Sequence, residues 1–213
     1  MKFRKDMLFL YAVTDQGFTG EKTLTEQIEE ALSAGVTLLQ LREKGLDKSI
    51  FLEEALIVRE LTRHYGIPLI INDDVEIALK CGADGVHVGQ DDLSPLEVRR
   101  LIGPERILGV TAKSPEQAKR AFMEGADYIG SGAIFPSPTK KDAAALTLEQ
   151  LSAICRSVPI PVTAIGGITG QNVSLLKGTG IAGAAVVSGI FGQGNITAAV
   201  HGLKEQLLKV VSL

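Results

Sequence analysis

Short runs of β-branched and aliphatic residues alternate with longer stretches of helical periodicity along the whole chain. This alternation is typical of parallel strands that are joined by helices packed on the outside of the sheet. Each run is followed by a segment that can form a helix. The eight runs predicted to be strands are residues 8–14, 38–42, 68–73, 85–88, 107–112, 128–132, 161–167 and 183–189.

A related phrase recurs before every second predicted strand, which indicates a repeat made of two strand–helix units. Three copies are close to one another and the fourth is looser; they cover residues 31–41, 78–88, 121–131 and 175–185. In each copy a glycine stands where the helix is expected to end, because glycine adopts the positive φ that turns the chain there. These glycines are Gly35, Gly82, Gly125 and, in the fourth copy, Gly178 or Gly180.

Four repeats of two units give eight strands, and the 213 residues of the chain fall in the lower part of the size range of a closed eight-stranded barrel. No proline- or serine-rich linker interrupts the pattern. We therefore predict an α/β fold, with a single (β/α)8 TIM barrel over residues 1–213. An open doubly wound sheet is the alternative at this point.

The composition narrows the class of protein. Apolar residues make up 45% of the chain and charged residues 22%, which is typical of a globular protein. The net charge of −3 argues against a nucleic-acid partner, which needs clustered Lys and Arg. No apolar run approaches the ~18 residues of a membrane span, and the charged N-terminus does not resemble a signal peptide. We expect a cytoplasmic protein that does not bind membranes.

Cationic and amide side chains cluster at the end of the second predicted strand. Gln40, Arg42 and Lys44 alternate along it, so an extended backbone places all three on one side. Active sites of such barrels lie at the carboxyl ends of the strands, where these cations need a counter-charge such as a substrate phosphate. The alternative is that they are solvated loop charges.

Carboxylates end the two strands that follow. Asn72, Asp73 and Asp74 close the third predicted strand, and Asp92 follows the fourth. Facing carboxylates repel each other, and Mg²⁺ relieves that repulsion while it also binds phosphate oxygens. The sequence therefore predicts Asp73 and Asp92 as magnesium ligands, whereas Asp74 is expected to cap the next helix.

Later strand ends offer hydroxyls and backbone amides. Residues 134–142 carry two hydroxyls and two lysines between prolines, which suggests a lid over an anionic ligand. The segments around Gly167 and Ser188 match the place where barrels often bind phosphate, although the glycines could serve only to turn the chain. His87 lies within the fourth predicted strand and is expected to be a core histidine without a catalytic role.

Taken together, these motifs resemble the thiamine phosphate synthase family over nearly the whole chain. They are L-Y-A-V-T-D, Q-L-R-E-K, I-I-N-D-D, G-A-D-G-V-H-V-G-Q-D-D-L, G-V-T, P-S-P-T-K-K-D, A-I-G-G-I and V-V-S-G-I. The resemblance implies a transferase that joins 4-amino-2-methyl-5-hydroxymethylpyrimidine diphosphate to 4-methyl-5-(2-phosphoethyl)thiazole, releasing pyrophosphate and forming thiamine monophosphate. It also implies one Mg²⁺ per subunit, and a homo-oligomer is compatible with it.

The resemblance further implies a role for each matching residue. The residues implied to be catalytic are Arg42, Lys44, Thr111 and Lys140. Those implied to bind substrates are Gln40, Leu41, Arg42, Glu43, Lys44, Asn72, Thr111, Ser137, Pro138, Thr139, Lys140, Gly167, Val187 and Ser188. Asp73 and Asp92 match the metal ligands. Thr111 stands where the family commonly has Ser, and Ser137 where it commonly has Thr, so each keeps a hydroxyl.

Two other functions stay open at this point. A thiazole tautomerase of the same superfamily would share the fold and the phosphate site but would not need the cation set and the carboxylate pair. A non-catalytic ligand-binding relative is the second alternative. The presence of Gln40, Arg42, Lys44, Asp73 and Asp92 together favours the synthase.

Overall fold

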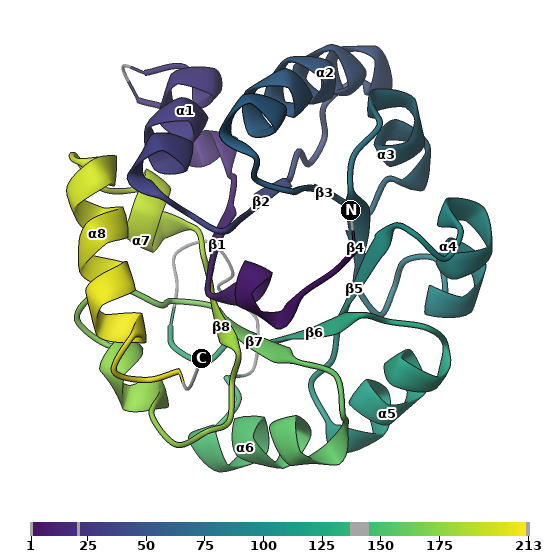
Figure 1. Cartoon of the computed structure of the whole chain (residues 1–213), viewed down its shortest axis with the longest axis vertical. Coiled ribbons are helices and arrows are strands. Elements are labelled where there is room, and N and C mark those ends of the chain that lie inside the picture. The colour runs from purple at the N-terminus through teal and green to yellow at the C-terminus, as the bar shows by residue number, and fades with distance from the viewer. Residues whose placement is uncertain (1, 21, 137–144, 212–213) are drawn as a thin grey trace.

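The computed structural model describes residues 2–20, 22–136 and 145–211, which form a ring of short strands surrounded by helices (Figure 1). The elements in chain order are η1 (Lys5–Leu8), β1 (Leu10–Val13), η2 (Gln16–Phe18), α1 (Leu24–Ala34), β2 (Leu38–Leu41), α2 (Lys48–Tyr65), β3 (Leu69–Asn72), α3 (Val75–Cys81), β4 (Gly85–Val88), α4 (Pro95–Ile102), β5 (Ile107–Thr111), α5 (Pro115–Met123), β6 (Tyr128–Ser131), α6 (Leu148–Ser157), β7 (Val162–Ile165), η3 (Val173–Leu176), β8 (Gly183–Val186), α7 (Ser188–Phe191) and α8 (Ile196–Leu207). None of the described helices is both long and apolar enough to span a membrane.

The strands pair in chain order, each parallel to the next, and β8 pairs with β1 to close the barrel. The predicted TIM barrel is confirmed, and the open doubly wound sheet is excluded. Several strands are shorter than predicted because their ends leave the ladder. After β7 the chain turns at Gly166 and Gly167, both with positive φ, and after β8 it enters α7 at Ser188.

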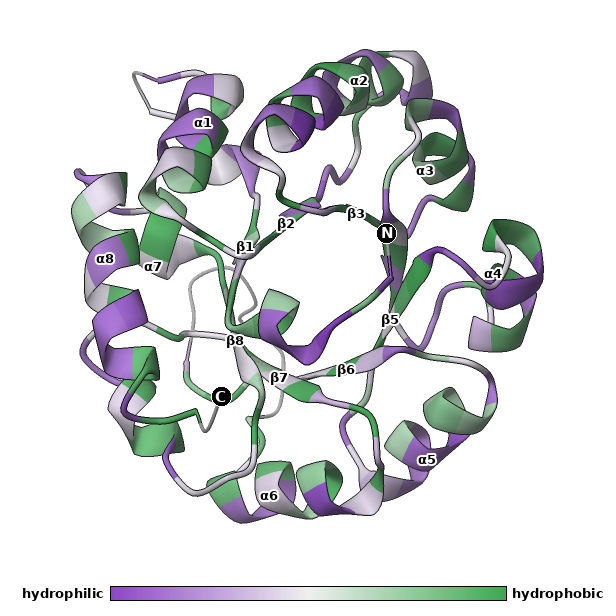
Figure 2. Ribbon diagram, in the orientation of Figure 1, coloured by the Kyte–Doolittle hydropathy of each residue, from purple (hydrophilic) through white to green (hydrophobic). Residues whose placement is uncertain are grey.

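Two hydrophobic layers lie on the two faces of the barrel. The outer layer fills the space between strands and helices, and Figure 2 shows hydrophobic and hydrophilic stretches alternating along those helices. The inner layer contains Tyr11 and Tyr128, both buried, and is covered at one end by Met7 and Leu8. Figure 1 shows this N-terminal segment lying across the opening of the ring. One end of the barrel is therefore packed with side chains.

The sequence repeat has a structural role at the start of the strands. In three copies, the residue two positions after the glycine accepts a hydrogen bond from the first or second backbone amide of the preceding strand. These bonds join Leu10 N to Thr37 Oγ1 (2.9 Å), Leu69 N to Asp84 Oδ2 (2.9 Å) and Leu108 N to Asp127 Oδ2 (2.8 Å). The looser fourth copy has Ala182 at this position and keeps only the backbone bond, from Ala182 N to Val162 O (2.7 Å).

Two of these repeat residues also hold an arginine from a helix. Asp84 pairs with Arg59 of α2, and Asp127 pairs with Arg99 of α4 at 2.7 Å. Because these partly buried carboxylates accept bonds from both a backbone amide and a guanidinium, their charge is compensated. The repeat therefore fastens strand to strand and helix to barrel at the end opposite the carboxyl ends of the strands.

Glycine in the inner layer makes room for aromatic side chains. A Cβ added at Gly109 of β5 would lie 2.1 Å from Cζ of Tyr128 and 2.5 Å from Nδ1 of His87. Register places Gly109 beside both residues, since it pairs with His87 on β4 and with Tyr128 on β6. The position therefore has no space for any side chain while Tyr128 and His87 keep their places.

We predict that Gly109→Ala lowers the free energy of unfolding by about 1–3 kcal/mol, because the added methyl group overpacks the barrel interior. Urea denaturation followed by circular dichroism measures the change. Gly202→Ala in α8 is the matched control: nothing lies within 4 Å of its added Cβ, so it should stabilise the helix by about 0.5–1 kcal/mol. A Gly109→Ala protein as stable as the wild type would contradict this account of the interior.

Candidate functional site

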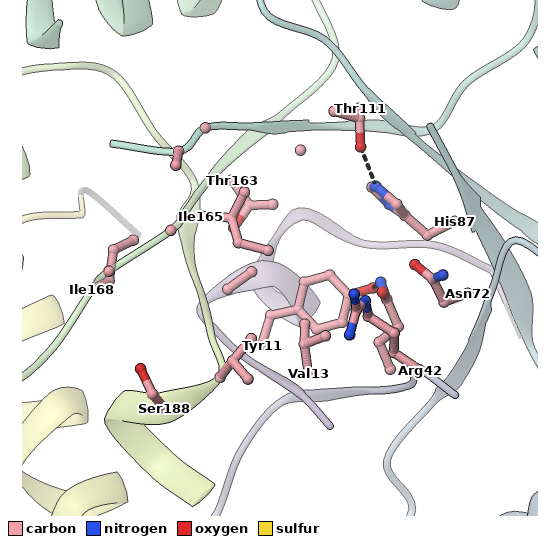
Figure 3. A pocket seen from close by; sticks show the side chains of 18 of the residues that line it. Tyr11, Val13, Arg42, Asn72, His87, Thr111, Thr163, Ile165, Ile168 and Ser188 are labelled. Carbon is pink, nitrogen blue, oxygen red and sulfur yellow. Dashed lines mark hydrogen bonds between the residues drawn. The ribbon is translucent and has the colours of Figure 1, made fainter. Parts of the chain in front are cut away.

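A cavity lies at the carboxyl end of the barrel and receives residues from all eight strands. Seven residues predicted from the sequence line it: Gln40, Arg42, Asn72, Thr111, Gly167, Val187 and Ser188. Figure 3 shows Arg42 and Asn72 on one side of the cavity and Ser188 on the other. The strand-end argument therefore gathers these residues around one space, with the cationic group and the hydroxyl at opposite sides.

The segment 40–44 divides its side chains between two faces. Gln40 and Arg42 line the cavity, whereas Leu41 is fully buried in the outer layer. Leu41 faces the helices because side chains alternate along a strand, and its role in substrate binding stays a prediction. Lys44 does not line the cavity, but its charge lowers the pKa of Asp73 and thus acts on the acidic group nearby.

Arg42 has a weak ionic partner within the described part of the chain. Its Nη1 lies 3.5 Å from Oδ2 of Asp15, at the long limit of a hydrogen bond. Its backbone is fixed instead, since the Arg42 amide donates to Oγ1 of Thr14 at 2.9 Å. A positioned guanidinium with a loose ion pair remains able to bind an anion in the cavity.

Asp73 and Asp92 meet beside Asn72. Burial of Asp73, its hydrogen bond with Asp92 and the charge of Asp92 raise the pKa of Asp73 to about 6, while Lys44 and Asn72 oppose the rise. Asp92 also accepts a hydrogen bond of 2.7 Å from the Gly89 amide. The structure thus brings together the two carboxylates that the sequence singled out.

The backbone of Asp73 is itself unusual. Its φ of +63° makes it the non-glycine residue of the described chain in the left-handed region, which aspartate tolerates better than most residues. Its amide donates to the carbonyl of His87 at 2.8 Å, which ties the turn to β4. Strained backbone of this kind is often found at functional sites.

The acidic pair is suited to a hard divalent cation. Within the described residues no group of three or more His, Cys, Asp or Glu side chains could hold a metal. Mg²⁺, however, commonly binds through one or two carboxylates and completes its shell with water and phosphate oxygens. Two facing carboxylates, one with a raised pKa, fit that ion.

Asp74 acts as the sequence predicted. Its Oδ1 accepts a hydrogen bond of 3.0 Å from the Ile77 amide and so caps α3. Asp92 caps no helix, because the capping residue of α4 is Ser94. The interpretation of Asp74 as a cap is therefore confirmed.

The opposite side of the cavity is built from backbone. Gly167 has a φ of +63°, and a Cβ there would lie 2.5 Å from the carbonyl oxygen of Pro136. The turn thus requires glycine for its own conformation, while Gly167 and Ser188 both line the cavity. Ser188 begins the short helix α7, whose first amides lack helical partners.

Four predicted residues lie outside the described residues: Ser137, Pro138, Thr139 and Lys140. The predicted lid falls on the same segment. The described residues on its two sides are held together, since the Leu146 amide donates to the Ala133 carbonyl at 2.8 Å. Ala133 lines the cavity, so the flank before the segment lies at the cavity.

The sequence did not single out several residues of the cavity. Lys113 lines it just after β5, a position that the strand-end argument could have found. Tyr11 also lines it, as does His87, which the sequence placed in the core. His87 is hydrogen-bonded to Tyr128 and Thr111, each at 3.0 Å (Figure 3 shows the bond to Thr111). Tyr11 and His87 lie in apolar runs of the sequence, and such runs do not indicate that a side chain reaches a polar site.

Known proteins resemble this chain in both sequence and structure. The sequence family described as Thiamine monophosphate synthase matches residues 10–190. The chain is 50% identical over 196 residues to a thiamine-phosphate synthase of Ruminiclostridium cellulolyticum, covering 92% of this chain and 93% of that protein. It is 45% identical to a thiamine-phosphate synthase of Clostridium botulinum, covering 96% of both. A solved structure of thiamine phosphate pyrophosphorylase from Pyrococcus furiosus superposes with a TM-score of 0.90 at 36% identity, covering 98% of this chain and 99% of that one.

Glu43 gives the site a pH-dependent contribution to stability. Burial, together with the charges of Glu54 and Asp15, raises the pKa of Glu43 to about 7, and Arg42 opposes this rise. An acid with a raised folded-state pKa favours the folded protein below its unfolded value near 4.5, and that contribution is lost as pH rises through 7.

We predict that Glu43→Gln raises the urea midpoint at pH 8 and leaves it unchanged at pH 4.5, because glutamine removes the buried charge. Urea titrations at both pH values measure this difference. Glu53→Gln, an exposed change on the same helix α2 as Glu54, should leave both midpoints where they are. Equal midpoints of Glu43→Gln and wild type at pH 8 would count against a buried charge at Glu43.

Proposed function

Because this chain belongs to the thiamine monophosphate synthase family, we propose that it joins 4-amino-2-methyl-5-hydroxymethylpyrimidine diphosphate to 4-methyl-5-(2-phosphoethyl)thiazole. The products are thiamine monophosphate and pyrophosphate. We propose that residues 1–213 act as one catalytic domain. The cavity at the carboxyl end of the barrel is the proposed active site.

The pyrimidine diphosphate is assigned to the side of the cavity with Arg42 and Asn72. A loosely paired guanidinium beside an amide suits diphosphate oxygens, and the nearby charge of Lys44 adds to the attraction. Gln40 and Thr111 also line the cavity and are proposed to hold the ring. On the basis of the family resemblance, Lys140 and the segment that includes Leu41 and Glu43 are proposed to bind the same substrate.

The proposed metal is one Mg²⁺ held by Asp73 and Asp92. The two facing carboxylates and the raised pKa of Asp73 support this assignment, as does the position of the pair beside Asn72 on the cation side of the cavity. When bound, the ion would neutralise part of the negative charge of the diphosphate. Protonation of Asp73 competes with a cation, so acid conditions oppose binding.

The thiazole phosphate is assigned to the other side of the cavity. Gly167, Val187 and Ser188 line it there, with backbone amides and a hydroxyl at the start of α7. Barrels commonly bind phosphate after the seventh and eighth strands, which supports the assignment. The resemblance adds Ser137, Pro138 and Thr139 from the neighbouring loop.

The proposed reaction exchanges one bond for another. The bond between the pyrimidine methylene carbon and the diphosphate oxygen breaks, and its electron pair leaves with pyrophosphate. The ring amine donates electrons to the resulting methylene cation, and the thiazole nitrogen then forms the new carbon–nitrogen bond. No protein nucleophile is consumed, so Arg42, Lys44, Lys140 and Thr111 are assigned to stabilise charge and orient the substrates.

The observation that carries this proposal is the acidic pair Asp73 and Asp92 beside Asn72, a residue that lines the cavity on the same side as Arg42 (Figure 3). A thiazole tautomerase moves a proton on a single substrate and has no need for a metal–diphosphate site. A non-catalytic relative would not need both sides of the cavity.

A pyrophosphate-release assay separates these functions. We expect release only when both substrates and Mg²⁺ are present. Conversion of the thiazole alone without metal would favour a tautomerase, and binding of both substrates without product would favour a non-catalytic relative.

Asp92→Asn tests the metal assignment. We predict a loss of turnover of about a hundredfold or more, because the pair loses a charge that holds the ion near the leaving group. Steady-state pyrophosphate release at saturating substrates measures it, with Mg²⁺ varied. The exposed neighbour Asp91→Asn is the control and should retain wild-type turnover. Wild-type activity of Asp92→Asn would refute the assignment of Asp92.

A further inference from the structure

A continuous line of hydrogen bonds crosses the interior of the barrel beneath the cavity. It joins side chains of five different strands in the order Gln40, Tyr11, Tyr128, His87, Thr111. Gln40 bonds to Tyr11, the two tyrosine oxygens are 2.8 Å apart, and the two contacts of the His87 ring are 3.0 Å each. Both ends of the line, Gln40 and Thr111, face the cavity.

The first bond sets the direction of all the others. The Gln40 amide nitrogen can only donate, so the Tyr11 oxygen accepts and the Tyr11 hydrogen is left for Tyr128. The Tyr128 oxygen accepts in turn, and its own hydrogen points to Nδ1 of His87. Burial raises the pKa of both tyrosines, so each hydroxyl keeps the one hydrogen that this direction needs.

The direction also fixes the state of the histidine. Nδ1 of His87 accepts from Tyr128, so the ring hydrogen of a neutral His87 lies on Nε2 and is donated to Oγ1 of Thr111. A doubly protonated ring would need Tyr128 to accept at both contacts, and the Tyr128 hydrogen would then have no acceptor along the line. Neutral His87 with hydrogen on Nε2 is therefore the state that satisfies every member.

We propose that Tyr11, Tyr128 and His87 are positioning residues that make Thr111 a hydrogen-bond donor and Gln40 a hydrogen-bond acceptor toward the substrate. Thr111 already accepts from His87, so its own hydrogen is available to the cavity. Gln40 uses its nitrogen on Tyr11, so its side-chain oxygen is available; within the described chain neither group has another side-chain partner.

The acceptor at Gln40 and the donor at Thr111 match polar groups of the proposed pyrimidine substrate, so this step rests on the proposed function. A 4-aminopyrimidine presents an amine that donates beside a ring nitrogen that accepts. Gln40 oxygen and Thr111 hydroxyl offer the complementary pair. A 4-oxopyrimidine presents the reverse pattern, so the line of bonds selects the amine over the carbonyl at this position.

The tautomer of His87 is the direct test, and it needs no substrate. In ¹⁵N-histidine-labelled protein with His64→Gln and His201→Gln, both exposed positions, His87 is the remaining histidine. Nitrogen chemical shifts at pH 8 are expected to show a protonated Nε2 and an unprotonated Nδ1. The opposite tautomer would mean that the line runs from Thr111 to Gln40, and either that result or a doubly protonated ring overturns the proposal.

Tyr128→Phe tests the effect on the substrate. Loss of the central hydroxyl removes the fixed donor to Nδ1, so the KM for the pyrimidine diphosphate should rise about tenfold, the effect of one neutral hydrogen bond. The KM for the thiazole phosphate should stay within about twofold, and His87 should show mixed tautomers. Tyr65→Phe, a half-buried tyrosine at the end of α2, is the control and should change neither constant.

The outcomes separate this proposal from the proposed function. An unchanged KM for the pyrimidine diphosphate, or an equal rise for both substrates, overturns the positioning role. A wild-type enzyme that releases no pyrophosphate from the two substrates overturns the proposed function instead. If Tyr128→Phe does not fold, the tautomer of His87 in otherwise unaltered protein still decides the direction of the line.

Discussion

The space inside the barrel limits which side chains its strands can carry. Eight short strands enclose only enough room for their own inward side chains, so a large residue on one strand requires a small one beside it. Gly109 and Gly130 leave room for the side chains of Tyr128 and His87. A Cβ at Gly130 would come within 2.9 Å of the His87 ring. Because the other end is packed with apolar side chains from the N-terminal segment, the polar ends of the tyrosines can bond only to one another and toward the cavity. The packing of the interior therefore determines which groups the cavity presents.

The rim of the barrel has a different character from its interior. Asp73 combines a left-handed backbone with a carboxyl that burial and Asp92 keep from ionising easily. Arg42 has a weak ion pair within the described chain, and burial raises the pKa of Glu43 to about 7. Local rules of good packing and charge compensation are broken together at this rim, as is common at functional sites. At the other end, the Arg59–Asp84 and Arg99–Asp127 ion pairs compensate their charges.

Much of the fold could be predicted from the sequence because strand alternation and the glycine-ended repeat are local signals. Those same signals placed Gln40, Arg42 and Asn72 at strand ends, and the structure gathers them around one cavity. The same alternation places the Leu41 side chain on the opposite face, toward the helices. The burial of His87 was also predicted, but its hydrogen bonds to Tyr128 and Thr111 were not, because they depend on how side chains of different strands meet inside the barrel.

The bonds at the start of the strands bear on how the chain reaches this structure. Thr37, Asp84 and Asp127 each fasten two consecutive strands, across separations of 27, 15 and 19 residues. Contacts over such short stretches form early at little cost in loop entropy, so pairs of strand–helix units can act as local folding units. The pairing of β8 with β1 spans most of the chain, and the fourth repeat, with Ala182, adds no side-chain bond near it. We therefore expect the slow step of folding to be the pairing of the last strand with the first, which closes the barrel.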